Sequence, residues 1–82
     1  MTKLEQKLIE LGYKYNEYVY CFGKKHSRFI SIFIELNKNK SKVKNFFVEY
    51  PTYLFKNQEQ IDTLQQAFYI MLRDLEELDN DR

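Results

Sequence analysis

Cys21 and His26 are the side chains best suited to covalent chemistry, because an imidazole beside a thiol can activate it as a nucleophile. Cys21 belongs to an alternating apolar run, and His26 belongs to the polar turn that follows it. We expect Cys21 to point into the core and His26 to lie at the turn, with no acidic residue to orient its ring. The pair therefore predicts a buried structural cysteine.

Metal, phosphate and acid–base sites have no better support. One histidine and one cysteine cannot complete a tetrahedral metal site, and the sequence lacks a glycine-rich phosphate loop and the HExxH and CxxC motifs. Asp74, Glu77 and Asp81 are expected on a solvent-exposed helix face, where nothing would separate their pKa values for hydrolysis. We predict a protein that is not an enzyme, with no catalytic residue, no metal, no cofactor and no small-molecule substrate.

The composition is typical of one small intracellular domain. Eighty-two residues, 44% of them hydrophobic and 17% aromatic, are enough for one modest core, so we expect a single domain over residues 1–82. The lone cysteine excludes an internal disulfide and fits a reducing compartment. No apolar run approaches the roughly 20 residues that span a bilayer, and the N-terminus resembles an amphipathic helix more than a signal peptide. The predicted location is the cytoplasm, away from membranes.

Two segments have helical patterns. Residues 3–11 follow the capping-box sequence TKLE and precede Gly12, a good left-handed terminator, which predicts a short helix. Asn57 is a good N-cap for a long helix over residues 58–78. The apolar residues of that helix recur at steps of three and four: Ile61, Leu64, Phe68, Met71, Leu75 and Leu78. This stripe predicts packing onto a sheet.

Three segments between the helices have strand patterns, at about residues 17–23, 28–36 and 43–50. Short polar turns connect them, so the sheet is predicted to be antiparallel, and Pro51 ends the third strand. We therefore predict an α+β fold of order α-β-β-β-α. In this fold a three-stranded antiparallel meander has the long C-terminal helix packed on one face.

Side-chain alternation then assigns residues to the two faces of the sheet. The isoleucines of the second strand should face the helix. A first hairpin that turns symmetrically about Lys25-His26 pairs Phe22 with Phe29 and places Cys21 beside the isoleucines. On this register the other face carries six aromatic rings: Tyr18, Tyr20, Phe22, Phe29, Phe33 and Phe47.

Six rings exceed the apolar area that a soluble monomer normally exposes in one patch. The first helix, or residues 53–55, could cover them. A second copy, another protein or stacked nucleic-acid bases could also do so. The rings and the nearby basic residues are the predicted partner-binding residues: Tyr18, Tyr20, Phe22, Lys24, Lys25, Arg28, Phe29, Phe33 and Phe47.

Charge is distributed unevenly along the chain. Residues 24–44 contain seven basic residues and one acidic residue, whereas residues 57–82 contain two basic and seven acidic residues. Solvated loops and a solvated helix would explain this, as would a charged surface that steers a partner. Exposed rings beside bases also suit single-stranded nucleic acid, although the RRM motif and order are missing and the net charge is only +1. Presentation of helix carboxylates in place of DNA phosphates is a further alternative.

The segments LEQKLIELGY and NQEQIDTLQQAF, with LRDLEEL after them, sit in a composition rich in Lys, Asn and Ile. In these segments and in this composition, the chain resembles small proteins encoded by phages and prophages of low-GC Gram-positive bacteria. The resemblance covers about half of the chain and supplies no catalytic residues to carry over. It implies a protein that acts by binding, to block, recruit or redirect a host or phage protein, sometimes a defence nuclease.

The leading hypothesis is therefore a non-enzymatic protein-binding module of a phage or mobile element that binds or inhibits a host or phage protein and could dimerise. The alternative is a single-stranded nucleic-acid-binding domain that uses the aromatic sheet face and the basic hairpin.

Overall fold

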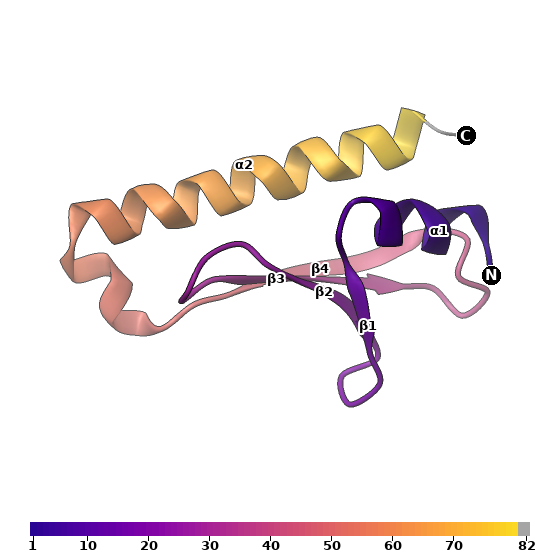
Figure 1. Ribbon diagram of the computed structural model, residues 1–82, viewed down its shortest axis with the longest axis horizontal. Coiled ribbons are helices and arrows are strands. Elements are labelled where there is room, and N and C mark those ends of the chain that lie inside the picture. Colours follow the sequence, from indigo (N-terminus) through magenta and orange to yellow (C-terminus); the bar gives the residue numbers. More distant parts are fainter. Residues whose placement is uncertain (81–82) are drawn as a thin grey trace.

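The computed structural model describes residues 1–80, and side chains through Leu78, so the predicted surface residue Asp81 lies outside the described part. An antiparallel sheet carries two α-helices on one of its faces (Figure 1). The elements in chain order are α1 (Lys3–Glu10), β1 (Lys14–Asn16), β2 (Cys21–Lys25), β3 (Ser31–Leu36), β4 (Val43–Glu49), the 3₁₀ helix η1 (Thr52–Lys56) and α2 (Gln58–Asn80). The α+β class is confirmed.

Helix α1 begins at the predicted residue, Lys3, and ends at Glu10, one residue before the predicted end. The Glu5 backbone N–H donates to Thr2 Oγ1 at 3.2 Å, and the Thr2 N–H donates to Glu5 Oε1 at 2.9 Å, which completes the capping box. Those hydrogen bonds hold the pKa of Glu5 below its usual value. After the helix, Gly12 adopts a φ of 98°, a conformation that an L-residue rarely takes. The chain can therefore reverse into β1.

The sheet has four strands in the order β1-β2-β3-β4, so the prediction of three strands is wrong. The segment expected as one strand over residues 17–23 is instead a turn followed by β2. Asn16 starts this turn, because its Oδ1 accepts the Tyr18 backbone N–H at 2.9 Å. Tyr20 ends it with a φ of 55°. Apolar alternation through residues 18–22 concealed the turn, which contains neither glycine nor proline.

The register of the first long hairpin also differs from the prediction. Phe22 pairs with Ile34, not with Phe29, and β2 continues to Lys25 before the chain turns through residues 26–30. The shift is an odd number of residues, so every β2 side chain changes face. Phe22 consequently joins the core at 3% exposure. Cys21, the neighbour of Phe22 in β2, therefore lies on the face away from α2 and not on the predicted helix side.

The pairing of β3 with β4 agrees with the predicted faces. Ile32 lies opposite Val48 and Ile34 opposite Phe46 on the helix side, while Phe33 lies opposite Phe47 on the other side. The described bounds of β3 and β4 fall within the predicted ranges 28–36 and 43–50.

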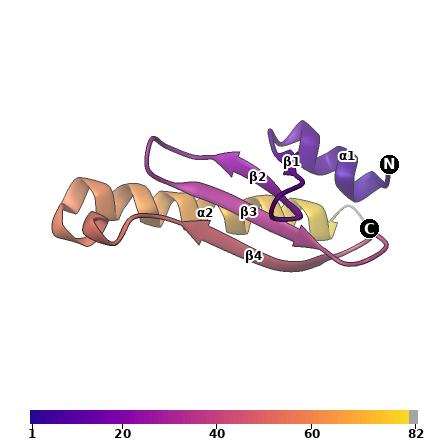
Figure 2. The same cartoon turned by 90° about the horizontal axis from the view of Figure 1, so that it is seen from below.

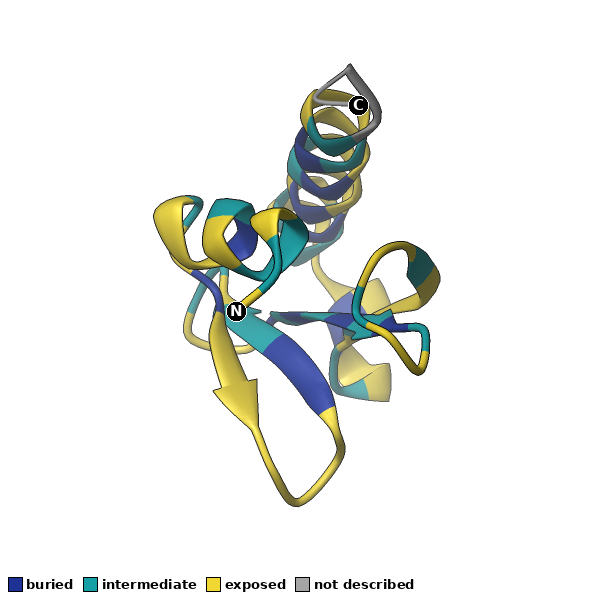
Figure 3. Ribbon diagram, turned by 90° about the vertical axis from the view of Figure 1, so that its right-hand side faces the viewer, coloured by how far each residue is buried: buried dark blue, intermediate teal, exposed yellow. Residues whose placement is uncertain are grey.

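Helix α2 covers one face of the sheet, as predicted, and extends two residues beyond the predicted end (Figures 1 and 3). Asn57 caps it, because Asn57 Oδ1 accepts the Glu59 backbone N–H at 2.9 Å. The buried line of α2 differs from the predicted stripe: Leu64, Ala67 and Met71 are buried, whereas Phe68 remains 41% exposed. Among the described side chains, the core comprises Leu8, Tyr13, Phe22, Ile30, Ile32, Ile34, Leu36, Leu54, Leu64, Ala67 and Met71.

A polar cluster joins α2 to the N-terminal half of the chain. Asp74 is 2% exposed, so the expectation of a solvent-exposed carboxylate is wrong. The Tyr13 hydroxyl donates to Asp74 Oδ2 at 3.2 Å, and Lys24 Nζ lies 3.8 Å from the same oxygen. The Lys24 ammonium also lies 5.4 Å from the centre of the Tyr13 ring. Burial, and then the negative charge of Asp74, raise the pKa of Tyr13.

A candidate binding groove on the open sheet face

The face of the sheet away from α2 carries no helix within residues 1–80 (Figure 2). Helix α1 and η1 could have covered it, but each contributes a buried leucine, Leu8 and Leu54, to the core on the α2 side. The face therefore remains open. The β1–β2 hairpin projects toward it, away from the helices (Figure 1).

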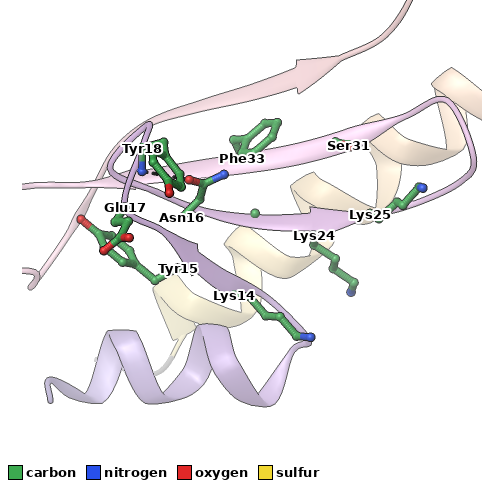
Figure 4. A pocket seen from close by; sticks show the side chains of 10 residues that line it. Lys14, Tyr15, Asn16, Glu17, Tyr18, Lys24, Lys25, Ser31 and Phe33 are labelled. Carbon is green, nitrogen blue, oxygen red and sulfur yellow. Dashed lines mark hydrogen bonds between the residues drawn. The ribbon is translucent and has the colours of Figure 1, made fainter.

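One hollow of about 540 Å³ lies between this hairpin and the centre of the sheet (Figure 4). Tyr18 and Asn16 border it from the hairpin, and Phe33 borders it from β3. Its complete lining is Lys14, Tyr15, Asn16, Glu17, Tyr18, Gly23, Lys24, Lys25, Ser31 and Phe33. The hollow thus combines aromatic walls with lysine side chains.

Gly23 allows the Phe33 ring to lie against the sheet. The two residues are cross-strand partners, and a Cβ at Gly23 would lie 2.9 Å from Phe33 Cε1, closer than such atoms ever approach. Phe33 is therefore half-buried against the β2 backbone and forms part of the floor of the hollow.

A second hollow of about 460 Å³ continues from the first along the same face. Lys25 and Ser31, which are partners across β2 and β3, line both hollows. The second hollow is further lined by Arg28, Phe29, Glu49, Tyr50 and Pro51. We call the two together the open-face groove, lined by the residues of both hollows.

Six of the nine predicted partner-binding residues line this groove: Tyr18, Lys24, Lys25, Arg28, Phe29 and Phe33. Phe47 lies beside it as the cross-strand partner of Phe33 and is 47% exposed. Tyr20 is 70% exposed at the end of the β1–β2 turn. Phe22 is removed from the site, because it is buried in the core on the helix side of the sheet. The six rings therefore do not form the single aromatic face that was predicted.

Sequence reasoning missed the contribution of β1. Lys14 and Asn16 reach the groove because β1 pairs with β2, with Lys14 opposite Gly23. The KYN segment that forms β1 is too short and too polar for an alternation pattern. The signal that could have revealed it is the Asn16 side chain at the start of a turn.

The cations of the groove are held in different ways. Lys24 pairs with Ile32, so its side chain lies on the helix side of the sheet, and its ammonium is directed to Asp74 and away from the groove. The Arg28 guanidinium lies 5.3 Å from the centre of the Phe29 ring, and that ring packs edge-on against Tyr53 at 6.1 Å. Lys14 and Lys25 are exposed. Glu17 and Glu49 are the acidic members of the lining, so Lys14, Lys25 and Arg28 provide three positive charges against two negative ones.

Cys21 lies beneath the β1–β2 turn, where its thiol donates to the Val19 carbonyl at 3.2 Å. It is 6% exposed, although it does not face α2 as expected. Burial raises the pKa of the Cys21 thiol, and the charge of Glu35 raises it further. An activated nucleophile requires the opposite shift. His26 lies beyond the far end of β2 from Cys21.

Within the described residues, no three acidic, histidine or cysteine side chains come together in a way that would hold a metal ion. Among those same residues, no helix combines the length and apolarity needed to cross a membrane. The groove offers hydrogen-bond donors, cations, two carboxylates and aromatic rings, which can contact an extended segment. Comparisons of the chain with protein-family models, curated proteins and solved structures gave no match.

Proposed function

We propose that this protein is a non-enzymatic binding module that holds an acidic segment of a partner protein in the open-face groove. The observation that carries the proposal is that the two hollows share Lys25 and Ser31. Because of this shared lining, the aromatic rings and the basic residues form one continuous site. Tyr18 at one end and Phe29 at the other provide apolar contacts, with cations between and around them. Tyrosine and arginine are among the residue types that most often dominate protein–protein binding energy.

The charges of the groove favour an acidic partner. Lys14, Lys25 and Arg28 are exposed, and each adds electrostatic attraction that speeds association. The resemblance to small phage and prophage proteins supports the same role, since such proteins often bind and inhibit a host or phage protein. The proposed partner is therefore a protein of the host or of the phage, encountered in the host cytoplasm.

The test is affinity capture from a lysate of a low-GC Gram-positive host. Lys25→Glu with Arg28→Glu reverses two groove charges, while Lys38→Glu with Lys42→Glu makes the same charge change in the exposed turn between β3 and β4. We expect the control to retain a specific partner and the groove variant to lose it by on the order of tenfold. Equal capture by both variants, or no specific capture by the native protein, would contradict the proposal.

Single-stranded nucleic acid is the second candidate, favoured by one observation. Phe33 and Phe47 are cross-strand neighbours beside the basic residues of the groove, and two nucleotide bases could stack on their rings. The packing of Phe33 against Gly23, which leaves less of this ring free for stacking, argues for a protein partner instead.

Fluorescence anisotropy with short labelled oligonucleotides at two salt concentrations separates the two candidates. Nucleic-acid binding requires an affinity that falls as salt rises and that Phe47→Ala weakens. A protein-binding groove predicts no oligonucleotide affinity beyond weak, salt-sensitive attraction that Phe47→Ala leaves unchanged.

A further inference from the structure

Strand β4 is an exposed edge of the sheet, with a neighbouring strand on one side only within residues 1–80. It is seven residues long and, apart from the irregularity near Lys44, pairs with β3 along its length. Its other side therefore presents unpaired backbone groups to solvent, which native proteins usually protect with charges, bulges or a covering element.

The alternation of antiparallel hydrogen bonds shows which groups face outward. The His26 N–H donates to the Ile30 carbonyl at 3.0 Å, so from that pair onward the even-numbered residues of β3 bond to β2 and the odd-numbered ones bond to β4. Phe33 lies opposite Phe47, so Phe47 bonds inward. The backbone groups of Phe46 and Val48 consequently point out from the edge.

Apolar side chains flank this edge on both faces. Phe46 on the helix side is 43% exposed, and Phe47 on the open side is 47% exposed. Leu75 of α2 lines a hollow of about 260 Å³ together with residues 43–46 of β4. Phe68 and Leu72 share a helix flank with Leu75, since they lie seven and three residues before it, and they are 41% and 52% exposed. Asp74 and its contacts to Tyr13 and Lys24 occupy the opposite flank.

We propose that β4 and this flank of α2 form a homodimer interface, in which the β4 strands of two copies pair antiparallel about a twofold axis perpendicular to the sheet. Such an axis places both α2 helices on the same face, so the Phe68–Leu72 flank of one copy meets the same flank of the other. A foreign strand added to β4 would leave that flank exposed. A second copy covers the edge and the flank together.

The charges of β4 and the topology of the sheet also favour a second copy of the chain at this edge. Antiparallel pairing brings the Lys44 end of one β4 against the Glu49 end of the other, so opposite charges meet. Residues 65, 68, 69, 72 and 75 along the flank are uncharged, as the centre of an interface requires, and Glu76, four residues after Leu72, places a charge toward its C-terminal end. The opposite sheet edge is β1, which has only three residues, so a second long edge for continued growth is missing. Pairing therefore closes at two copies.

The experiment is light scattering after size exclusion over a hundredfold range of concentration. Leu72→Lys acts on the helix flank, Phe46→Lys acts on the edge strand, and Val19→Lys is the matched control at an exposed apolar residue of the β1–β2 turn. We expect a concentration-dependent dimer for the native protein and the control, and at least tenfold weaker association for either interface variant. Circular dichroism of each variant verifies that it folds.

Amide hydrogen exchange locates the contact. The inward-bonded amides of Phe47 and Glu49 should be protected at every concentration, whereas those of Phe46 and Val48 should gain protection only as the dimer forms. A monomer at all concentrations would overturn the proposal, as would a dimer that both interface variants retain. Amide exchange rates of Phe46 and Val48 that do not change with protein concentration would overturn it as well. None of the substituted residues lines the open-face groove, so this outcome is independent of partner capture.

Discussion

The Tyr13 hydroxyl donates to Asp74 Oδ2 at 3.2 Å, which joins two buried residues that lie 61 positions apart in the chain. Lys24 completes the cluster from β2. The contact links the residue that follows Gly12 to the C-terminal half of α2. A hydrogen bond to a charged group in such surroundings is worth more than an average one, and losing one partner leaves the other buried and unsatisfied.

Removing this contact should destabilise the fold in a graded way. We expect Tyr13→Phe to lower the free energy of unfolding by about 1 kcal/mol, because Asp74 keeps Lys24. Asp74→Ala should cost about 1–3 kcal/mol, because it leaves the Tyr13 hydroxyl buried without an acceptor. Urea unfolding followed by circular dichroism measures both, with Glu77→Ala as the control on the exposed side of the same helix. Equal midpoints for Asp74→Ala and Glu77→Ala would refute this account.

The same contact predicts a loss of stability in alkaline solution. The pKa of Tyr13 is raised in the folded protein, so the folded state keeps this proton where the unfolded state releases it. The contribution is therefore fully present below about pH 10 and declines as the pH rises above it. Unfolding measured between about pH 8 and pH 11 should show this decline, and Tyr13→Phe should flatten it. Tyr69→Phe, at a residue 68% exposed on α2, should keep the native slope.

Both helices could be predicted from the sequence because their signals are local. Thr2 and Glu5 form the capping box, Gly12 supplies the positive φ, and Asn57 caps α2. The alternating isoleucines of β3 likewise place Ile32 and Ile34 in the core without knowledge of any partner strand.

The errors in the predicted sheet arise at its first two turns. Tyr20 adopts a left-handed conformation that its residue type does not indicate, so the β1–β2 turn was predicted as strand. The register of β2 with β3 was wrong because the chain turns through residues 26–30 and not about Lys25-His26. The groove depends on that register, because only the pairing of Lys25 with Ser31 joins its two hollows. Asp74 was misplaced for another reason: its partner Tyr13 is distant in sequence, and no local pattern distinguishes a buried aspartate from a solvated one.

Tyr20 carries a conformational cost that substitution should remove. Its φ of 55° is strained for a residue with a Cβ, and its side chain is 70% exposed, so little packing opposes the change. We expect Tyr20→Gly to leave stability unchanged or to raise it by up to about 1 kcal/mol. Val19→Gly, one position earlier in the same turn and without a positive φ, should lower it. Thermal unfolding of both variants measures the contrast, and destabilisation by Tyr20→Gly equal to that of Val19→Gly would contradict the strain.

Gly23 and Phe33 offer a test in which a substitution should change sign with its background. A Cβ at Gly23 would meet the Phe33 ring at 2.9 Å, so Gly23→Ala must displace the ring and should cost about 1 kcal/mol or more. With Phe33→Ala the obstacle is gone, and the lower chain entropy of alanine should make the same substitution stabilising by about 0.5 kcal/mol. A double-mutant cycle on urea unfolding gives the coupling between the two residues. Additive changes in the free energy of unfolding would mean that the Phe33 ring does not lie against Gly23. Phe33 would then not form the floor of the open-face groove.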